Sequence, residues 1–313
     1  MVGRFCWLAV ALITCGLGVG LAPVMAQSQG EVATPKTLVV NGFPRTYRIY
    51  VPARRGNRRL PLLIALHGGG GSGAGMERLT QFSRLARQMG FVVIYPDGHN
   101  RHWHDRRDPR FLPQASVEDI LFINQLLDAV QQEYDIDPQR IYATGISNGG
   151  FFSQTLVCDL SHRLAAVAVV ASNLPQALAA DCPATQPVPI LYILGTQDPL
   201  IPYEGGVIRG RKGRQGVVYS AHASLDYWRN RYQLPARPQE IALPDRVNDQ
   251  TTARQITYQR GQLAVSLITI DGGGHTWPGG SQYLPKSFIG RVSQDFDGSQ
   301  MVWQFVSRYR RSP

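Results

Sequence analysis

The sequence lacks the features that would divide the chain or mark a nucleotide-binding site. Residues 27–313 contain no Pro/Thr-rich linker, internal repeat or low-complexity tract, so we expect a single domain there. The glycine-rich stretch 68–75 has no Gly-Lys-Ser/Thr sequence, which excludes a phosphate-binding P-loop. Apolar residues make up 43% of the chain, enough to fill the core of one large domain.

The first 26 residues have the pattern of a cleaved export signal. Arg4 precedes an apolar run over 5–21, and Val24 and Ala26 are small residues at the positions that a signal peptidase reads. A retained anchor is the alternative, but glycines interrupt a run that is already short. A lipoprotein box at 12–15 is disfavoured by the threonine before its cysteine. We therefore expect a secreted protein, extracellular or periplasmic, that is cleaved near Ala26 and keeps no transmembrane anchor.

Cysteine is scarce in the part of the chain that follows the predicted signal. Of the 4 cysteines only Cys158 and Cys182 lie beyond the signal, and in an oxidising compartment such a pair predicts one disulfide. Two unpaired buried thiols are the alternative, although Asp181-Cys182-Pro183 is typical of an exposed loop.

Positive charge exceeds negative charge, with 32 Lys and Arg against 22 Asp and Glu. A basic exported protein is attracted to anionic polysaccharide or to the cell envelope, so we expect such a surface as a partner and no nucleic acid. The basic stretch Arg209–Arg214 could bind acidic glycans or nucleic acid, but it has no interleaved aromatic residues, which favours a solvated lid. We expect a monomer.

Short apolar runs alternate with amphipathic stretches along the chain. Two arms, 37–40 and 46–51, flank Asn41-Gly42 and predict a hairpin. Further runs predict buried strands at 60–66, 91–96, 140–144, 165–170, 188–194 and 263–270, and helices are expected at 76–88, from 116, from 151, at 221–231 and at 300–308. Strands that alternate with helices predict an α/β fold with a mostly parallel central sheet and helices on both faces.

The stretch Gly145-Ile146-Ser147-Asn148-Gly149 lies between a predicted strand and a predicted helix. Gly-x-Ser-x-Gly in that position is the nucleophile elbow, a turn so sharp that the serine is strained and the glycines prevent a clash of strand and helix. The helix N-terminus directs amide dipoles toward charge that develops beside the serine. An ordinary tight turn is the alternative, because small residues gather in many turns. We predict Ser147 as a nucleophile.

A serine nucleophile needs a base and an acid that orients the base, and on such a fold they follow in the order Ser, Asp/Glu, His. His275 lies in a glycine-rich loop just after the last predicted strand, whereas His222 begins a helix. Asp198 follows the preceding strand and is the predicted acid. A turn aspartate before proline is the alternative for this residue.

The loop His67–Gly71 follows a predicted strand and has the HGGG pattern, which supplies backbone N–H groups to an oxyanion. The N–H of Asn148 would be the partner donor. His102, His104 and Asp105 could instead indicate a metal centre, but such close neighbours tend to point to different sides and a fourth ligand is missing. We therefore expect no metal and no organic cofactor.

Five motifs stand in the order found in one family. They are Leu66-His67-Gly68-Gly69, Val117–Phe122, Gly145–Gly150, Asp198-x-x-Ile201-Pro202-Tyr203-x-Gly205-Gly206 and Gly274-His275-x-Trp277-Pro278-Gly279. From about residue 37 to the C-terminus the chain resembles the secreted polyhydroxybutyrate-depolymerase-like and feruloyl-esterase-like α/β-hydrolases of the carbohydrate-esterase family-one type.

This resemblance implies an α/β-hydrolase fold and a set of site residues. The implied catalytic residues are Ser147, Asp198 and His275. The implied oxyanion hole is made by the amides of Gly69 and Asn148, and a disulfide is implied between Cys158 and Cys182. Trp103, Tyr203 and Trp277 are expected near the substrate.

We expect a serine esterase that hydrolyses short-chain, feruloyl-type or hydroxyalkanoate esters through an acyl-enzyme. Alternatives on the same residues are an acyltransferase, in which a sugar or lipid alcohol replaces water, and an extracellular polyhydroxybutyrate depolymerase. Because the sequence shows no polymer-docking domain, we expect soluble esters to react faster than solid polyester. A glycan- or surface-binding protein on a hydrolase fold is the non-enzymatic alternative, and the complete Ser/Asp/His set argues against it.

Overall fold

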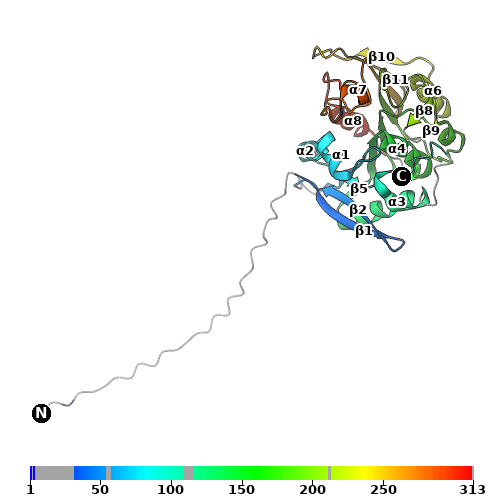
Figure 1. Cartoon of the computed structure of the whole chain (residues 1–313). Helices are drawn as coiled ribbons and strands as arrows, with labels where there is room; N and C mark the ends of the chain where they lie inside the picture. Colours follow the sequence, from blue (N-terminus) through cyan, green and yellow to red (C-terminus); the bar gives the residue numbers. More distant parts are fainter. Residues whose placement is uncertain (2, 4–31, 54–57, 109–115, 211–212, 312–313) are drawn as a thin grey trace.

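A computed structural model describes residues 1, 3, 32–53, 58–108, 116–210 and 213–311 (Figure 1). The predicted export signal and its cleavage near Ala26 lie outside these residues, apart from Met1 and Gly3. Among the helices of the described ranges, none has the length and apolarity that a membrane span requires.

A 10-stranded sheet forms the centre of the domain, in the order β1-β2-β4-β3-β5-β6-β7-β12-β11-β10. Its strands are β1 (Thr34–Val40), β2 (Phe43–Tyr50), β3 (Leu60–Leu66), β4 (Val92–Pro96), β5 (Ile136–Ile146), β6 (Ala166–Val170), β7 (Ile190–Gly195), β10 (Gln239–Ala242), β11 (Thr252–Arg260) and β12 (Leu263–Asp271). From β4 to β12 in this order neighbouring strands are parallel, whereas the pairs at both edges are antiparallel.

Helices cover both faces of the sheet because its strands are apolar on both sides. Along β3, Leu62, Ile64 and Leu66 enter one core cluster and the alternate residues Leu63 and Ala65 enter the other. The first cluster includes α3 (Ser116–Glu133), α4 (Asn148–Asp159) and α6 (Ala221–Arg231); the second includes α1 (Gly73–Thr80), α2 (Phe82–Met89) and α8 (Gly298–Val306). The predicted α/β-hydrolase architecture is confirmed.

The helix predicted at 76–88 is two helices, α1 and α2. Gln81 separates them with a left-handed φ of 53°, and its N–H donates to the carbonyl of Glu77 at 2.9 Å. The hydroxyl of Thr80 donates to the carbonyl of Met76 at 2.7 Å, one turn earlier. Glutamine normally favours helices, so the residue type at position 81 does not predict this break.

The basic stretch predicted as a solvated lid belongs to a separate hairpin. Strands β8 (Gly206–Gly210) and β9 (Gly213–Val218) pair with each other outside the main sheet. Two of the basic residues, Arg211 and Lys212, lie outside the described residues.

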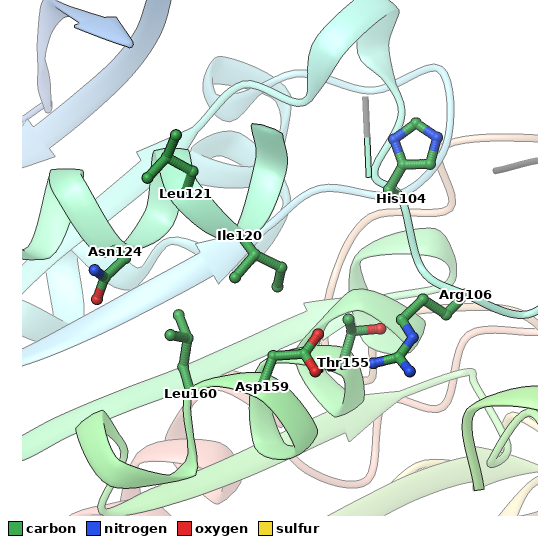
Figure 2. A pocket seen from close by; sticks show the side chains of 8 residues that line it. All are labelled: His104, Arg106, Ile120, Leu121, Asn124, Thr155, Asp159 and Leu160. Atoms are coloured by element: carbon green, nitrogen blue, oxygen red, sulfur yellow. Dashed lines mark hydrogen bonds and ion pairs between the residues drawn. The ribbon is translucent and has the colours of Figure 1, made fainter. Parts of the chain in front are cut away.

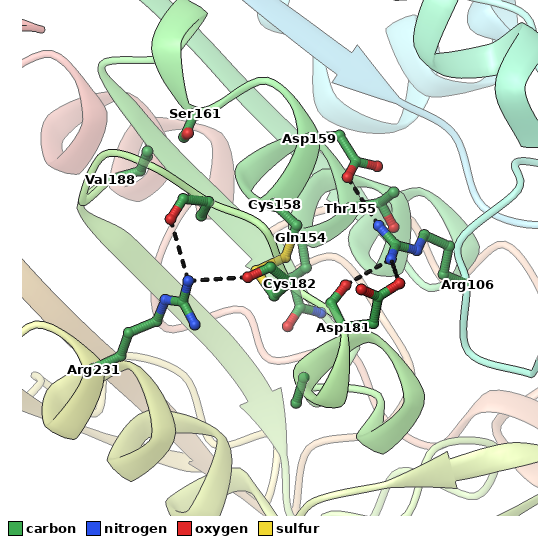
Figure 3. Close-up of a disulfide and its surroundings, with 12 residues drawn as sticks. Arg106, Gln154, Thr155, Cys158, Asp159, Ser161, Asp181, Cys182, Val188 and Arg231 are labelled. Carbon is green, nitrogen blue, oxygen red and sulfur yellow. Dashed lines mark hydrogen bonds and ion pairs between the residues drawn. A yellow bond between two sulfur atoms is a disulfide. The ribbon is translucent and has the colours of Figure 1, made fainter.

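A disulfide joins Cys158, near the end of α4, to Cys182 (Figure 3). Beside it, Arg106 forms ion pairs with Asp159 at 2.8 Å and Asp181 at 2.6 Å. The pairing predicted from the cysteine count is thus present. It ties the C-terminal end of α4 to the loop that follows α5 (Gln176–Ala180).

Candidate active site

The predicted site residues all follow strands that end at one side of the sheet. Gly69 follows β3, Ser147 follows β5, Asp198 follows β7 and His275 follows β12. These strands are parallel, so their carboxyl ends point the same way. The carboxyl edge of an open parallel sheet is where such folds bind ligands.

Ser147 occupies a strained turn between β5 and α4. Its φ is 56° and its ψ is −122°, a combination that non-glycine residues rarely adopt. A Cβ atom on Gly145 would collide with the backbone of Gly149, and one on Gly149 would collide with the carbonyl of Leu66. Both glycines are therefore required for the turn, and Ser147 remains partly exposed between two buried neighbours.

The structure brings Asp198 and His275 together. His275 Nδ1 lies 2.7 Å from Asp198 Oδ2, and their side chains are 4% and 3% exposed. Asp198 Oδ1 accepts hydrogen bonds from the backbone N–H groups of Leu200 and Ile201, each at 2.8 Å. Since a carboxylate only accepts, Nδ1 of the neutral imidazole carries the proton and Nε2 is the unprotonated ring nitrogen.

The loop that carries His275 extends from β12 to helices α1 and α2. Trp277 packs edge-on against Phe82 of α2, with ring centroids 5.8 Å apart. Its Nε1–H donates to the hydroxyl of Ser299 at 3.1 Å, which in turn donates to the carbonyl of Thr80 at 2.6 Å. The loop therefore begins at the end of β12 and reaches helices that follow β3. Since β5, β6 and β7 lie between these two strands, the loop crosses the carboxyl ends of the parallel strands.

Gly69 and Asn148 are neighbours across two loops. A Cβ atom on Gly69 would lie 3.6 Å from Asn148 Cβ, and one on Gly68 would lie 3.5 Å from Ser147 Cβ. In the described part of the chain, the amides of Gly70 and Gly71 donate to the carbonyls of Arg101 and Gly68, while that of Gly69 has no protein acceptor. Asn148 begins α4, where the first N–H groups have no partner in the helix. Two unpaired donors thus lie beside Ser147.

His67 supports this loop as a neutral imidazole. The Gly98 N–H donates to Nε2 at 3.0 Å, so Nδ1 holds the proton and donates to the carbonyl of Gly68 at 2.8 Å. Burial lowers the pKa of His67, mainly because the charged form would lose its hydration.

The aromatic residues expected near the substrate are buried. Trp103, Tyr203 and Trp277 are 4%, 7% and 1% exposed. Trp103 stacks on Phe152 with ring centroids 5.0 Å apart, and its Nε1–H donates to the carbonyl of His67. The hydroxyl of Tyr203 contacts that of Thr269 at 2.7 Å. With so little of each ring exposed, the three residues support the loops of the site from behind, and their contact with a substrate stays a prediction.

The side chains of the stretch 102–105 diverge. His102 lies against Gly69, with Nε2 3.1 Å from the position of an added Cβ atom. His104 faces Asp119, and Asp105 contacts Asn148 and Arg107. In the described residues, no group of three or more His, Cys, Asp or Glu side chains could hold a metal ion.

A cavity of about 450 Å³ lies between α3, α4 and the segment 104–106 (Figure 2). It is lined by His104, Arg106, Ile120, Leu121, Asn124, Thr155, Asp159 and Leu160. Thr155 is eight residues beyond Ser147 in sequence, or about 12 Å along the helix at ~1.5 Å per residue. The cavity therefore belongs to the far end of α4 and not to the surface beside Ser147.

Several supporting residues had no detectable sequence signal. Asn173, after β6, donates through Nδ2 to the carbonyls of Pro202 and Tyr219, each at 2.9 Å, and so supports the loop that follows Asp198. The hydroxyl of Ser172 donates to the carbonyl of Ser147 at 2.6 Å. These are single polar residues whose partners lie far away in sequence, and no spacing rule points to them.

The chain is similar to known esterases. Residues 45–180 match the family described as esterase PHB depolymerase. The putative esterase NocK from Nocardia uniformis subsp. tsuyamanensis is 29% identical over 87% of this chain and 82% of its own length. Feruloyl esterase B from Piromyces equi is 27% identical, and the bifunctional acetylxylan esterase/xylanase XynS20E from Neocallimastix patriciarum is 30% identical. The matches cover 70% and 86% of this chain, but only 40% and 34% of those two proteins.

A solved structure has the same fold. The acetyl xylan esterase from Aspergillus awamori superposes with a TM-score of 0.62 over 88% of this chain and 99% of its own, at 14% sequence identity. At that identity the likeness concerns the fold alone.

Proposed function

We propose that this chain, whose residues 45–180 match the esterase PHB depolymerase family, is a serine esterase with Ser147, His275 and Asp198 as its triad. The observation that supports this most strongly is the buried Asp198–His275 hydrogen bond at the sheet edge that also carries the strained Ser147. A protein that only binds a surface has no need of a backbone strained at one serine or of a buried aspartate that orients one imidazole.

The proposed reaction proceeds through an acyl-enzyme. Asp198 keeps the proton on Nδ1, so His275 Nε2 accepts the Ser147 proton as Oγ bonds to the ester carbonyl carbon. The carbonyl oxygen becomes negative and is stabilised by the amides of Gly69 and Asn148 and by the N-terminus of α4. When the carbon–alkoxide bond breaks, His275 returns the proton to the leaving alcohol. Water then repeats the sequence, releasing the acid and free Ser147.

The proposed substrates are small soluble carboxylic esters with acetyl, short-chain or feruloyl acyl groups. The names of the relatives support acetyl and feruloyl groups in particular. We also propose export, with cleavage near Ala26, because a disulfide persists in an oxidising compartment. N-terminal sequencing of protein recovered outside the cytoplasm should begin near Gln27, and an uncleaved Met1 there would contradict this.

A fluorophosphonate tests the chemistry. It should label Ser147 alone, as mapped by mass spectrometry, and Ser147→Ala should abolish both the label and turnover of p-nitrophenyl butyrate. Continued turnover by Ser147→Ala would disprove the mechanism. A side-by-side assay with p-nitrophenyl acetate, p-nitrophenyl butyrate, methyl ferulate and a polyhydroxybutyrate film then ranks the acyl groups.

A further inference from the structure

The segment Trp103–Arg107 lies along α4 and contacts the first turn of this helix. We propose that Asp105 is a positioning residue of the oxyanion hole, which acts through the side chain of Asn148 to fix the direction of the Asn148 backbone N–H. This inference rests on the proposed function, because it concerns one of the two amides assigned there. The side chain of Asp105 contacts Asn148 and Arg107.

The carboxamide of Asn148 is bound on every side by this segment. Its Oδ1 accepts from the N–H of Trp103 at 2.7 Å, and its Nδ2 donates to the carbonyl of Trp103 at 2.9 Å. The second N–H of Nδ2 donates to Asp105 Oδ2 at 2.6 Å. The residue is 2% exposed, so a rotation of its side chain would leave buried polar groups unpaired. Asn148 therefore cannot turn independently of the segment.

Burial of the Asp105 carboxylate is energetically unfavourable. It is 6% exposed, and burial raises its pKa, while the guanidinium of Arg107 and the Asn148 amide favour the charged form. Arg107 Nε lies 3.1 Å from Asp105 Oδ2, and its guanidinium lies 5.1 Å from the ring of Phe151, also in the first turn of α4. A hydrogen bond to a carboxylate is roughly twice as strong as one between neutral groups. The charge thus strengthens the contact that holds Asn148.

The same part of the chain contacts the loop of the second proposed donor, Gly69. Trp103 Nε1–H donates to the carbonyl of His67 at 3.0 Å, and two residues before the segment the carbonyl of Arg101 accepts from Gly70 N–H at 2.8 Å. One short stretch of chain therefore contacts both loops that supply the hole. Since oxyanion donors act only at about 2.7–3.1 Å from the developing charge, the separation of the two amides must be closely controlled. Asp105 anchors the Asn148 end of this arrangement.

The experiment compares an ester with its thiono analogue, in which sulfur replaces the carbonyl oxygen. Sulfur is larger and accepts hydrogen bonds poorly, so the analogue gains little from an oxyanion hole. We expect Asp105→Ala to lower kcat for p-nitrophenyl butyrate by about 10- to 100-fold, less than the ~10²–10³ for removal of a donor, with KM nearly unchanged. Turnover of the thiono ester should fall much less, so the oxo/thiono ratio of kcat/KM falls. Asp105→Asn keeps an acceptor and should lie between Asp105→Ala and the native protein.

Asp159→Asn is the matched control, because it breaks the ion pair with Arg106 at the opposite end of the same helix. It should leave the oxo/thiono ratio at the native value, whatever it does to the melting temperature. If both Asp105 variants lower the two rates equally, Asp105 only stabilises the fold and the proposal is overturned. If Asp105→Ala does not fold, Asp105→Asn decides by the same ratio. Failure of the proposed function is distinguishable, since it would leave Ser147→Ala active.

Discussion

Gly195, at the end of β7, lies directly against the carbonyl of Gly273, in the loop after β12. The N–H of Gln197 donates to that carbonyl at 2.8 Å, and a Cβ atom on Gly195 would collide with it. This close approach of two backbones brings the loop of Asp198 to the loop of His275. The distance between acid and base therefore depends on a residue without a side chain.

Replacement of Gly195 by alanine should separate the two loops. We expect Gly195→Ala to lower kcat by at least about 10-fold, because small displacements of reacting groups are costly, and to lower the melting temperature. Gly75→Ala is the control, since an added Cβ atom there makes only an ordinary contact at 3.4 Å and alanine favours helices. Full activity of Gly195→Ala would show that the approach is not needed.

Asp198→Asn should reduce kcat for p-nitrophenyl butyrate by up to ~10⁴ without unfolding the protein, because an amide can donate to the imidazole and stabilise the wrong tautomer. Asp271→Asn is the comparison: its carboxylate pairs with Arg254 at the surface, where ion pairs contribute little. Steady-state kinetics on both variants checks the assignment. A severe loss in Asp271→Asn together with an active Asp198→Asn would reverse it.

His67 should make stability depend on pH. Its pKa is lowered from the ordinary value of 6.5, so between the lowered value and 6.5 the unfolded chain binds more protons than the folded one. Stability then rises with pH through this window, and the contribution is complete above 6.5. Urea midpoints measured from about pH 5 to pH 7.5 should fall on acidification, and His67→Gln should reduce that fall. The exposed His162 supplies the control, because His162→Gln should leave the slope unchanged.

The Cys158–Cys182 disulfide should contribute about 3 kcal/mol by the chain-entropy estimate, since it closes a loop with a sequence separation of 24. The Cys158→Ala/Cys182→Ala variant should therefore melt several degrees lower. Differential scanning calorimetry with and without reductant measures this. Reductant should lower the melting temperature of the native protein and not that of the variant; equal responses would mean that the bond does not form.

Trp277→Ala should impair catalysis rather than selectivity. The indole is buried and holds the His275 loop through Phe82 and Ser299, so its loss should cost about 3–5 kcal/mol of stability. We expect kcat to fall for acetyl, butyryl and feruloyl esters alike. A rise of KM confined to aromatic acyl groups would instead restore the stacking role inferred from the sequence.

The sequence predicted those structural features that depend on residues close together in the chain. The hairpin at Asn41-Gly42, the buried strands and the elbow at Ser147 each depend on neighbouring residues, and their positions agree with the structure. The approach of Asp198 to His275 was expected from chain order. In contrast, the burial of Trp103 and Trp277 and the contact of Asp105 with Asn148 depend on packing between distant segments. A tryptophan next to an active-site motif gives the same sequence pattern whether its ring faces the substrate or the core.

The two edge strands of the main sheet determine how readily copies of the protein can aggregate through strand pairing. An edge strand exposes unpaired N–H and C=O groups that a second chain could extend into a shared sheet. Here the edges are β10, which has only 4 residues, and β1, where Pro35 lacks an N–H and Lys36 places charge. The parallel strands of the sheet are enclosed between these two short or blocked edges. Such a protein should resist strand-to-strand aggregation at high concentration.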